Sequence, residues 1–68
     1  MDFSTRLRAL RNERNETQAQ VAEAVGMTCR QYQRFEAGDS NPILDNFCAL
    51  ADHFGVSLDY LAGRRDER

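Results

Sequence analysis

Apolar residues recur every three or four positions along most of this chain, which is the spacing of one face of an α-helix. No stretch shows the strict alternation of apolar and polar residues that marks a half-buried strand. The pattern predicts helices at about 4–14, 18–25, 29–37, 44–54 and 58–62. The predicted fold class is therefore all-α, a single compact five-helix domain over residues 1–68, with a charged, frayed tail at 64–68.

The first and fourth helices carry the clearest apolar faces. Ser4 is expected to cap the first helix, and Leu7 and Leu10 form its inner face. Asn15 follows where the helix should stop in a left-handed turn, which Asn tolerates better than most residues. Pro42 directs the chain into the fourth helix, whose predicted buried face consists of Leu44, Phe47, Leu50, Ala51 and Phe54.

The two helices in the middle of the chain are joined by a turn of only three residues. Thr17 and Gln20 have the spacing of a capping box at the start of the first of them, and Gly26 ends it in a left-handed conformation. Thr28 and Gln31 repeat the capping-box spacing, so the second helix begins almost at once.

The second of these helices has one apolar and one polar face. Tyr32 and Phe35 lie three residues apart and are predicted to pack inward. The residues left facing outward are Cys29, Arg30, Gln33 and Arg34. This outward face is polar and basic.

The net charge of −2 argues against a nucleic-acid-binding domain, since such domains are usually basic. The charge is unevenly spread, however. All nine cations are arginine, and six of them lie between Arg6 and Arg34, whereas residues 42–63 contain three aspartates and no arginine. One end of the domain is therefore expected to be locally positive.

Several classes of protein are not expected. The chain has two cysteines, no apolar leader and no apolar run of membrane-spanning length, which predicts a cytoplasmic protein with no membrane partner. Cys48 and His53 are five residues apart and do not share a helix face, so Cys48 is predicted in the core, His53 on the surface, and no metal or cofactor is expected. No combination of residues suggests catalysis, so an enzyme is not expected.

The order and spacing of several segments resemble the phage-repressor and Xre-like helix-turn-helix family, which has a lambda-repressor-like fold. These segments are RLRALR at 6–11, TQAQVAEAVGMT at 17–28, RFEAG at 34–38, NP at 41–42 and GVSLDYLAG at 55–63. The resemblance implies a sequence-specific regulator of transcription, expected to be a repressor, that binds double-stranded DNA.

The resemblance makes 29–37 the recognition helix, which enters the major groove. Arg30 and Arg34 are one turn apart, and each can form two hydrogen bonds to guanine, while Gln33 can pair with adenine. Gln31 and Cys29 are further base-contact residues, although Gln31 has an alternative role in the capping box. Without the family pattern, Arg30 and Arg34 would simply be solvated charges.

Phosphate contacts are implied for Gln18, at the positive end of its helix, and for Thr17 and Asn41. In the family, the positions of Arg11 and Glu36 form a largely buried ion pair, and Arg11 is a secondary phosphate candidate. Cys29 has two interpretations. Its thiol either packs near DNA or acts as a redox switch at a helix N-terminus.

Four features depart from the family pattern. Glu16 stands where relatives usually bury a leucine, and it is expected to turn toward solvent. Asp39 and Ser40 replace cations that face the phosphate backbone, and Ile43 replaces the usual Ser or Thr cap. The acidic net charge is the fourth departure.

The resemblance also implies a homodimer on a two-fold symmetric operator, with recognition helices roughly 34–36 Å apart. The expected dimer surface consists of Phe54, Val56, Tyr60 and Leu61, with the alternative that these residues only close the core. A second hypothesis is a helix-turn-helix module that binds a protein partner, as an antitoxin or a repressor partner does, with weak or no DNA binding. The acidic composition and the loop at Asp39 favour this second hypothesis.

Overall fold

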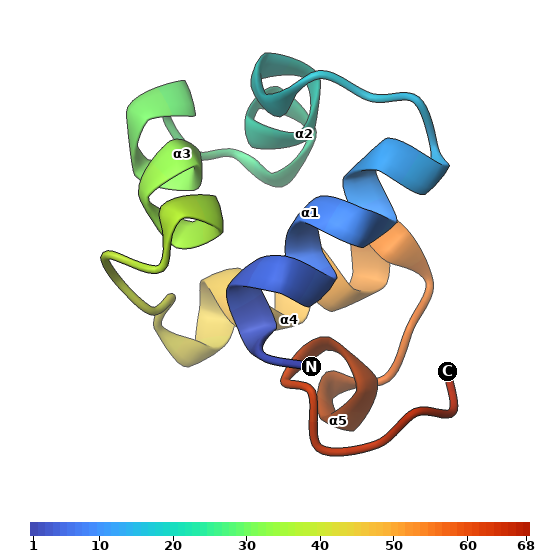
Figure 1. Cartoon of the computed structure of the whole chain (residues 1–68). Coiled ribbons are helices and arrows are strands. Elements are labelled where there is room, and N and C mark those ends of the chain that lie inside the picture. Colours follow the sequence, from blue (N-terminus) through green and yellow to red (C-terminus); the bar gives the residue numbers. More distant parts are fainter.

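A computed structural model describes every residue from Met1 to Arg68, and these residues form five helices and no strand (Figure 1). The helices are α1 (Phe3–Glu13), α2 (Gln18–Val25), α3 (Cys29–Ala37), α4 (Leu44–Phe54) and α5 (Leu58–Leu61). This confirms the predicted all-α, five-helix fold. None of the helices is both long and apolar enough to cross a membrane.

All five helices contribute to one apolar core. Its ten buried residues are Leu7, Leu10, Val21, Ala22, Tyr32, Phe35, Leu50, Ala51, Phe54 and Leu61. Leu44 was predicted in this core, but its side chain is 70% exposed, so that prediction is wrong. Apolar spacing identifies which face of a helix is buried, but it does not show how much of the helix the neighbouring helices cover. The first turn of α4 extends beyond the helices that pack against the rest of α4.

The start of α1 also differs from the prediction. Asp2, not Ser4, is the N-cap, and its Oδ1 accepts a hydrogen bond of 2.9 Å from the backbone N–H of Thr5. Ser4 lies inside the helix and donates its hydroxyl to the same carboxylate. A carboxylate is a stronger acceptor than a hydroxyl and is favoured by the helix dipole, so the helix begins one residue earlier than expected.

The helix-turn-helix is closed by short-range hydrogen bonds. Thr17 and Gln20 form a complete capping box, in which Thr17 Oγ1 accepts from the Gln20 N–H and Gln20 Oε1 accepts from the Thr17 N–H. Gly26 adopts the left-handed conformation, with φ of 76°, where α2 ends. Thr28 Oγ1 accepts from the Gln31 N–H, but the Gln31 side chain does not return the bond. The second box is thus only half formed, and the Gln31 amide is free.

Glu36, near the end of α3, joins three helices. Its carboxylate is nearly inaccessible to solvent and accepts hydrogen bonds from Arg11 Nε (2.6 Å), Arg11 Nη2 (3.1 Å) and Gln18 Nε2 (3.2 Å). Burial alone would raise the pKa of Glu36, but the hydrogen bonds from Arg11 and Gln18 outweigh burial and lower it. Glu36 therefore carries its charge in the folded protein and fixes the orientation of α3.

A second polar cluster joins the α1–α2 turn to the end of α4. Glu16 lies between Arg14 Nε, at 2.9 Å, and His53 Nε2, at 2.9 Å, and the side chains of Glu16 and His53 are both largely buried. Arg14 Nη1 also donates to the carbonyl oxygen of His53. His53 was predicted on the surface and Glu16 in solvent, and both predictions are wrong. Each residue alone would be costly to bury, but each supplies the other's hydrogen-bonding partner.

The C-terminal tail, which was predicted to be frayed, makes several contacts with the rest of the domain. Arg68 pairs with the Glu13 carboxylate through contacts of 2.5 and 2.6 Å. The guanidinium of Arg6 lies 3.8 Å from the centre of the Tyr60 ring and donates to Arg65 and Asp66 of the tail. The tail runs beside α5, on the side of the domain away from α3 (Figure 1).

Candidate nucleic-acid interface

α3 lies at one edge of the domain (Figure 1). Arg30, Gln31, Gln33 and Arg34 are all exposed, whereas Tyr32 and Phe35 are buried on the opposite side. Cys29 differs from the prediction that it faces outward, because it is only partly exposed and packs against the core. Four of the five predicted base-contact residues are therefore accessible as a group.

The arginines of α3 are free of ion pairs, unlike most arginines of this protein. Six of the nine arginines pair with a carboxylate, namely Arg6, Arg8, Arg11, Arg14, Arg65 and Arg68. The remaining three are Arg30, Arg34 and Arg64. Two of the three unpaired guanidinium groups thus lie one turn apart on the same exposed helix face, where their donors are available to a ligand. The locally positive face predicted from the sequence is located here.

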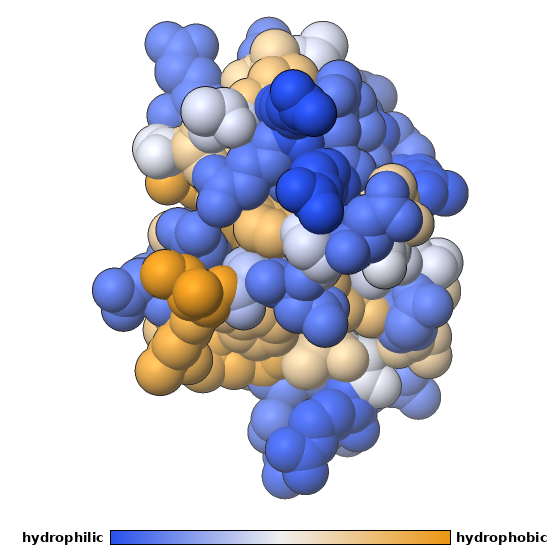
Figure 2. Space-filling model, turned by 90° about the vertical axis from the view of Figure 1, so that its left-hand side faces the viewer, coloured by the Kyte–Doolittle hydropathy of each residue, from blue (hydrophilic) through white to orange (hydrophobic).

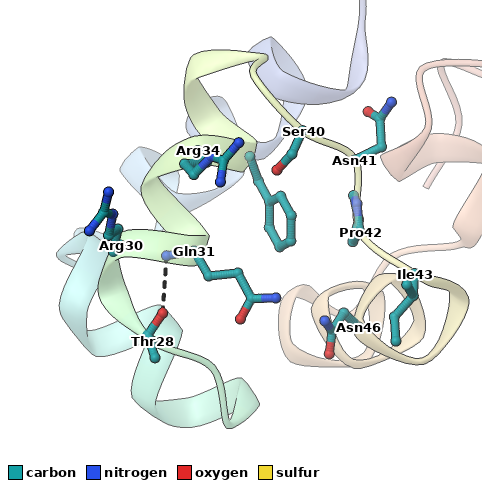
Figure 3. A pocket seen from close by; sticks show the side chains of 10 residues that line it. Thr28, Arg30, Gln31, Arg34, Ser40, Asn41, Pro42, Ile43 and Asn46 are labelled. Carbon is teal, nitrogen blue, oxygen red and sulfur yellow. Dashed lines mark hydrogen bonds between the residues drawn. The ribbon is translucent and has the colours of Figure 1, made fainter.

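A hollow of about 350 Å³ separates α3 from the loop before α4 and the first turn of α4. Figure 3 shows Gln31 extending across it from α3 toward Asn46 of α4, with Arg34, Ser40 and Asn41 around its upper side. Arg30 also lines the hollow, and its guanidinium group points away from the other labelled side chains. The side chains around the hollow are mainly hydrogen-bond donors and acceptors, and Arg30 and Arg34 provide its only charges.

Figure 2 looks directly onto this side of the molecule. Strongly hydrophilic atoms dominate the upper part of the face, and one compact apolar patch lies at its left edge. The exposed large apolar residues in this part of the chain are Ile43 and Leu44. Ile43 also lines the hollow.

The four predicted phosphate-contact residues occupy different environments. Thr17 and Asn41 are exposed, and Asn41 lies beside the hollow. Gln18 is partly buried and donates to Glu36. Arg11 donates to Glu36 and to the carbonyl oxygen of Glu16, so its guanidinium points inward. The exposed pair, Thr17 and Asn41, is therefore better placed to meet a ligand than Arg11.

The four residues predicted at a dimer surface lie largely inside the monomer. Leu61 is fully buried and Phe54 is 7% exposed, and both belong to the core. Val56 and Tyr60 are partly buried and pack against that core. These positions fit the alternative in which the four residues close the core.

Sequence reasoning did not single out Asn46 as part of this site. Asn46 lies in the first turn of α4 and lines the hollow opposite α3. No local motif marks it, because its position depends on the path of the loop from Gly38 to Ile43. Only the packing of α4 brings Asn46 to the side of Gln31.

Comparison with known families identifies the class of protein. Residues 7–61 match the family model HTH_3, described as a helix-turn-helix, and the chain belongs to this family. This confirms the resemblance drawn from the sequence segments. The family consists of DNA-binding regulators rather than enzymes, as expected from the absence of catalytic residues in the sequence.

Two curated relatives are transcriptional regulators. The chain is 36% identical over 64 residues to the cryptic phage CTXphi transcriptional repressor RstR of Vibrio cholerae, covering 94% of this chain and 57% of RstR. It is 37% identical over 65 residues to the uncharacterized HTH-type regulator YobD of Bacillus subtilis, covering 96% of this chain and 58% of YobD. The chain thus spans a little over half the length of these relatives.

Solved structures share the whole fold. The P22 c2 repressor, solved in complex with a synthetic operator, aligns with a TM-score of 0.90 and 26% identity, covering 96% of this chain and 98% of that one. A transcriptional regulator from Listeria innocua aligns with a TM-score of 0.87 and 27% identity, covering 98% of this chain and 63% of that one. The domain therefore has the repressor-type helix-turn-helix fold.

Proposed function

We propose that this protein is a sequence-specific, double-stranded DNA-binding repressor of transcription that places α3 in the major groove. The observation that carries the proposal is the pair of unpaired arginines, Arg30 and Arg34, on the exposed face of the second helix of a helix-turn-helix. RstR is named as a repressor and the P22 c2 repressor was solved on an operator, and these relatives support the assignment.

The side chains of α3 have the chemistry needed to read base edges. An arginine guanidinium forms two parallel hydrogen bonds to guanine O6 and N7, and a glutamine amide pairs in the same way with adenine. Arg30 and Arg34 are free for the first contact, while Gln33 is free for the second. Gln31, which is not engaged in a capping box, adds a second amide on the side of the hollow.

The phosphate backbone is proposed to meet mainly neutral groups. Thr17 and Asn41 are both exposed, Asn41 lies beside the hollow, and the loop residues Asp39 and Ser40 supply no cation. Each phosphate neutralised by a cation contributes about −0.9 to the slope of log affinity against log salt. Binding by this domain is therefore expected to depend only weakly on salt for a DNA-binding protein.

We also propose that the protein occupies its operator as a two-fold homodimer. One domain of this size reaches only one half-site, because its longest dimension is 28 Å while recognition helices of paired domains lie roughly 34–36 Å apart. Two copies related by a two-fold axis read a palindrome, which increases specificity. The partners of the protein are then operator DNA and a second copy of itself.

Selection from a random pool of double-stranded DNA at low salt tests this function. The expected result is enrichment of a motif in which two inverted half-sites are separated by one helical turn. A folded protein that enriches nothing at low salt would remove the DNA-binding function. It would leave the second hypothesis, a module that binds another protein, which the acidic net charge favours.

A further inference from the structure

Gln31 and Asn46 approach one another across the hollow between α3 and α4 (Figure 3). Gln31 is exposed and Asn46 is half-buried. Neither side-chain amide makes a hydrogen bond within the domain, because Thr28 Oγ1 accepts only from the backbone N–H of Gln31. Each amide carries two N–H donors and an acceptor oxygen. Two amides without partners therefore lie at the flank of the proposed reading face.

We infer that Asn46 is a positioning residue for base reading by Gln31. When the domain is on DNA, the side-chain oxygen of Asn46 accepts one amide N–H of Gln31 and holds that amide toward a base edge. This inference rests on the proposed DNA-binding function. It adds a residue of α4, outside the recognition helix, to those that determine which sequence is read.

Gln31 occupies a position on α3 that suits base reading. It is the third residue of the helix, and the N-terminal residues of a recognition helix are the ones that meet base edges. Arg34 lies on the same side of α3, since residues three apart in a helix share a face. Both side chains line the hollow. The Gln31 amide is therefore within reach of the bases next to the one that Arg34 contacts.

Reading adenine uses only part of the Gln31 amide. Adenine presents N7 as an acceptor and N6 as a donor, so it engages one N–H and the oxygen of the glutamine. The second N–H of Gln31 is left without a partner. Water reaches this group in the free domain, but DNA lying over the hollow excludes water, and a donor left unpaired there weakens binding. An acceptor inside the hollow removes this cost.

Asn46 is the best-placed acceptor in the hollow. The two arginines that line it carry donors only, and its apolar lining residues have neither donors nor acceptors in their side chains. Ser40 and Asn41 lie around the upper side of the hollow, whereas the Gln31 side chain extends toward the lower side (Figure 3). Thr28 Oγ1 already accepts from the backbone of Gln31.

The same contact reduces the entropic cost of reading. A glutamine side chain has several rotatable bonds and loses much rotamer freedom when it is fixed. A group that a neighbour holds in its bound geometry contributes more to affinity, and a neighbour on a helix holds it more precisely than one on a loop. Asn46 lies in the first turn of α4. Without it, the Gln31 amide turns to solvent and discrimination between bases is lost.

The test uses the double-stranded fragment enriched by the wild-type chain, together with fragments in which each base pair of one half-site is exchanged in turn. Gln31→Ala identifies the base pair that Gln31 reads, where discrimination should fall from about tenfold to within about twofold. Asn46→Leu removes the acceptor at similar side-chain size, and Asn46→Ala removes it with less bulk. Circular dichroism verifies the fold of every variant.

Asn46→Leu and Asn46→Ala are expected to lose discrimination at the same base pair as Gln31→Ala. The combination of Asn46→Leu with Gln31→Ala should lose no more than Gln31→Ala alone, because the two residues act as a unit. Asn46→Asp keeps an acceptor and should keep the discrimination, while its added charge lowers the affinity for all fragments alike. Ser40→Asp adds the same charge beside the hollow and is the matched control for that general loss.

Gln33→Ala is a second control. Gln33 is exposed on α3 but does not line the hollow. This variant should reduce discrimination at a different base pair, and its effect should add to that of Asn46→Leu.

Four results would overturn the inference while leaving DNA binding intact. In the first, Gln31→Ala changes discrimination at no base pair. In the second, Asn46→Leu and Asn46→Ala keep the discrimination that Gln31→Ala loses. In the third, they lower the affinity for all fragments equally and add to Gln31→Ala, as a phosphate contact or a purely structural role predicts. In the fourth, Asn46→Asp loses the discrimination, so an acceptor is not what Gln31 needs.

A folded wild-type chain that enriches no DNA would remove the proposed function and this inference together.

Discussion

Arg11 and Glu36 lie 25 residues apart in the sequence and share two hydrogen bonds, of 2.6 and 3.1 Å. This pair ties α3 to α1 near the C-terminal end of α3, two residues after Arg34. Gln18 of α2 donates to the same carboxylate. The orientation of the recognition helix thus depends on a buried charge, and this makes Glu36 the most sensitive polar position of the domain.

Replacement of this carboxylate should largely unfold the protein. Glu36→Gln leaves the guanidinium of Arg11 without a counter-charge in a site from which water is mostly excluded, which costs about 3–5 kcal/mol. A single core in a domain of this size rarely supplies more than about 3–5 kcal/mol of stability in total. Urea unfolding followed by circular dichroism measures the change. The control is Glu13→Gln, whose partner Arg68 is half exposed, and it should have a much smaller effect.

Acid should destabilise the protein through the same residue. The pKa of Glu36 is lower in the folded state than its ordinary value of 4.5, so the unfolded chain takes up the proton first as the pH falls. The stability that Glu36 contributes is present above its unfolded pKa and is lost as the pH falls through the folded pKa. Urea midpoints measured between pH 7 and pH 3 should decrease accordingly.

A double variant isolates this contribution to acid sensitivity. R11M with E36M replaces the buried pair by apolar side chains and should stay folded, because such exchanges are often neutral or stabilising. Asp2 and Glu13, whose pKa values are also lowered, remain in both proteins. The double variant should therefore lose less stability on acidification than wild type. Identical losses would show that Glu36 does not contribute.

A new cap on α4 should stabilise the monomer. Ile43→Ser places a hydroxyl where the backbone N–H groups of the first turn have no side-chain acceptor. The gain expected from an N-cap of this kind is about 0.5–1 kcal/mol. The melting temperatures of Ile43→Ser and Ile43→Ala should be compared. Both variants lose the isoleucine side chain, so the difference between them measures the effect of the cap. Equal melting temperatures for the two variants would mean that no cap has formed.

Glu16 and His53 should be energetically coupled. Their side chains are within 2.9 Å of each other and join the α1–α2 turn to α4. A double-mutant cycle with Glu16→Ala and His53→Ala should give a coupling energy of about 0.5–1 kcal/mol, measured from urea unfolding at pH 6. Additive effects of the two substitutions would show that the contact contributes nothing to stability.

Much of the fold was predictable because its signals are local. Capping residues such as Thr17 and Thr28, and a glycine where α2 ends, mark helix boundaries within a few residues of sequence, and apolar spacing identifies the inward face of each helix. The predictions failed where a long-range partner decides the outcome. Glu16 and His53 are 37 residues apart, and nothing near either of them indicates that they meet.

The candidate site was only partly predictable for the same reason. The exposed face with Arg30 and Arg34 follows from the period of α3. Neither guanidinium group pairs with a carboxylate. This could not be predicted, because it depends on where every acidic residue lies in three dimensions. The exposure of Leu44 beside Ile43 was not predicted, because apolar spacing assigned Leu44 to the core. The first turn of α4 lies beyond the core.

The most direct test of the central claim is a titration of the enriched DNA fragment, followed by fluorescence anisotropy, with variants that remove two arginines each. Arg30→Ala with Arg34→Ala should weaken binding at least about tenfold, because each bidentate contact contributes about 1–3 kcal/mol. Arg64→Ala with Arg65→Ala removes the same charge from the tail, away from α3, and should change the affinity by less than about threefold. Equal losses in both variants would contradict base reading through α3 and would indicate general attraction between arginines and DNA.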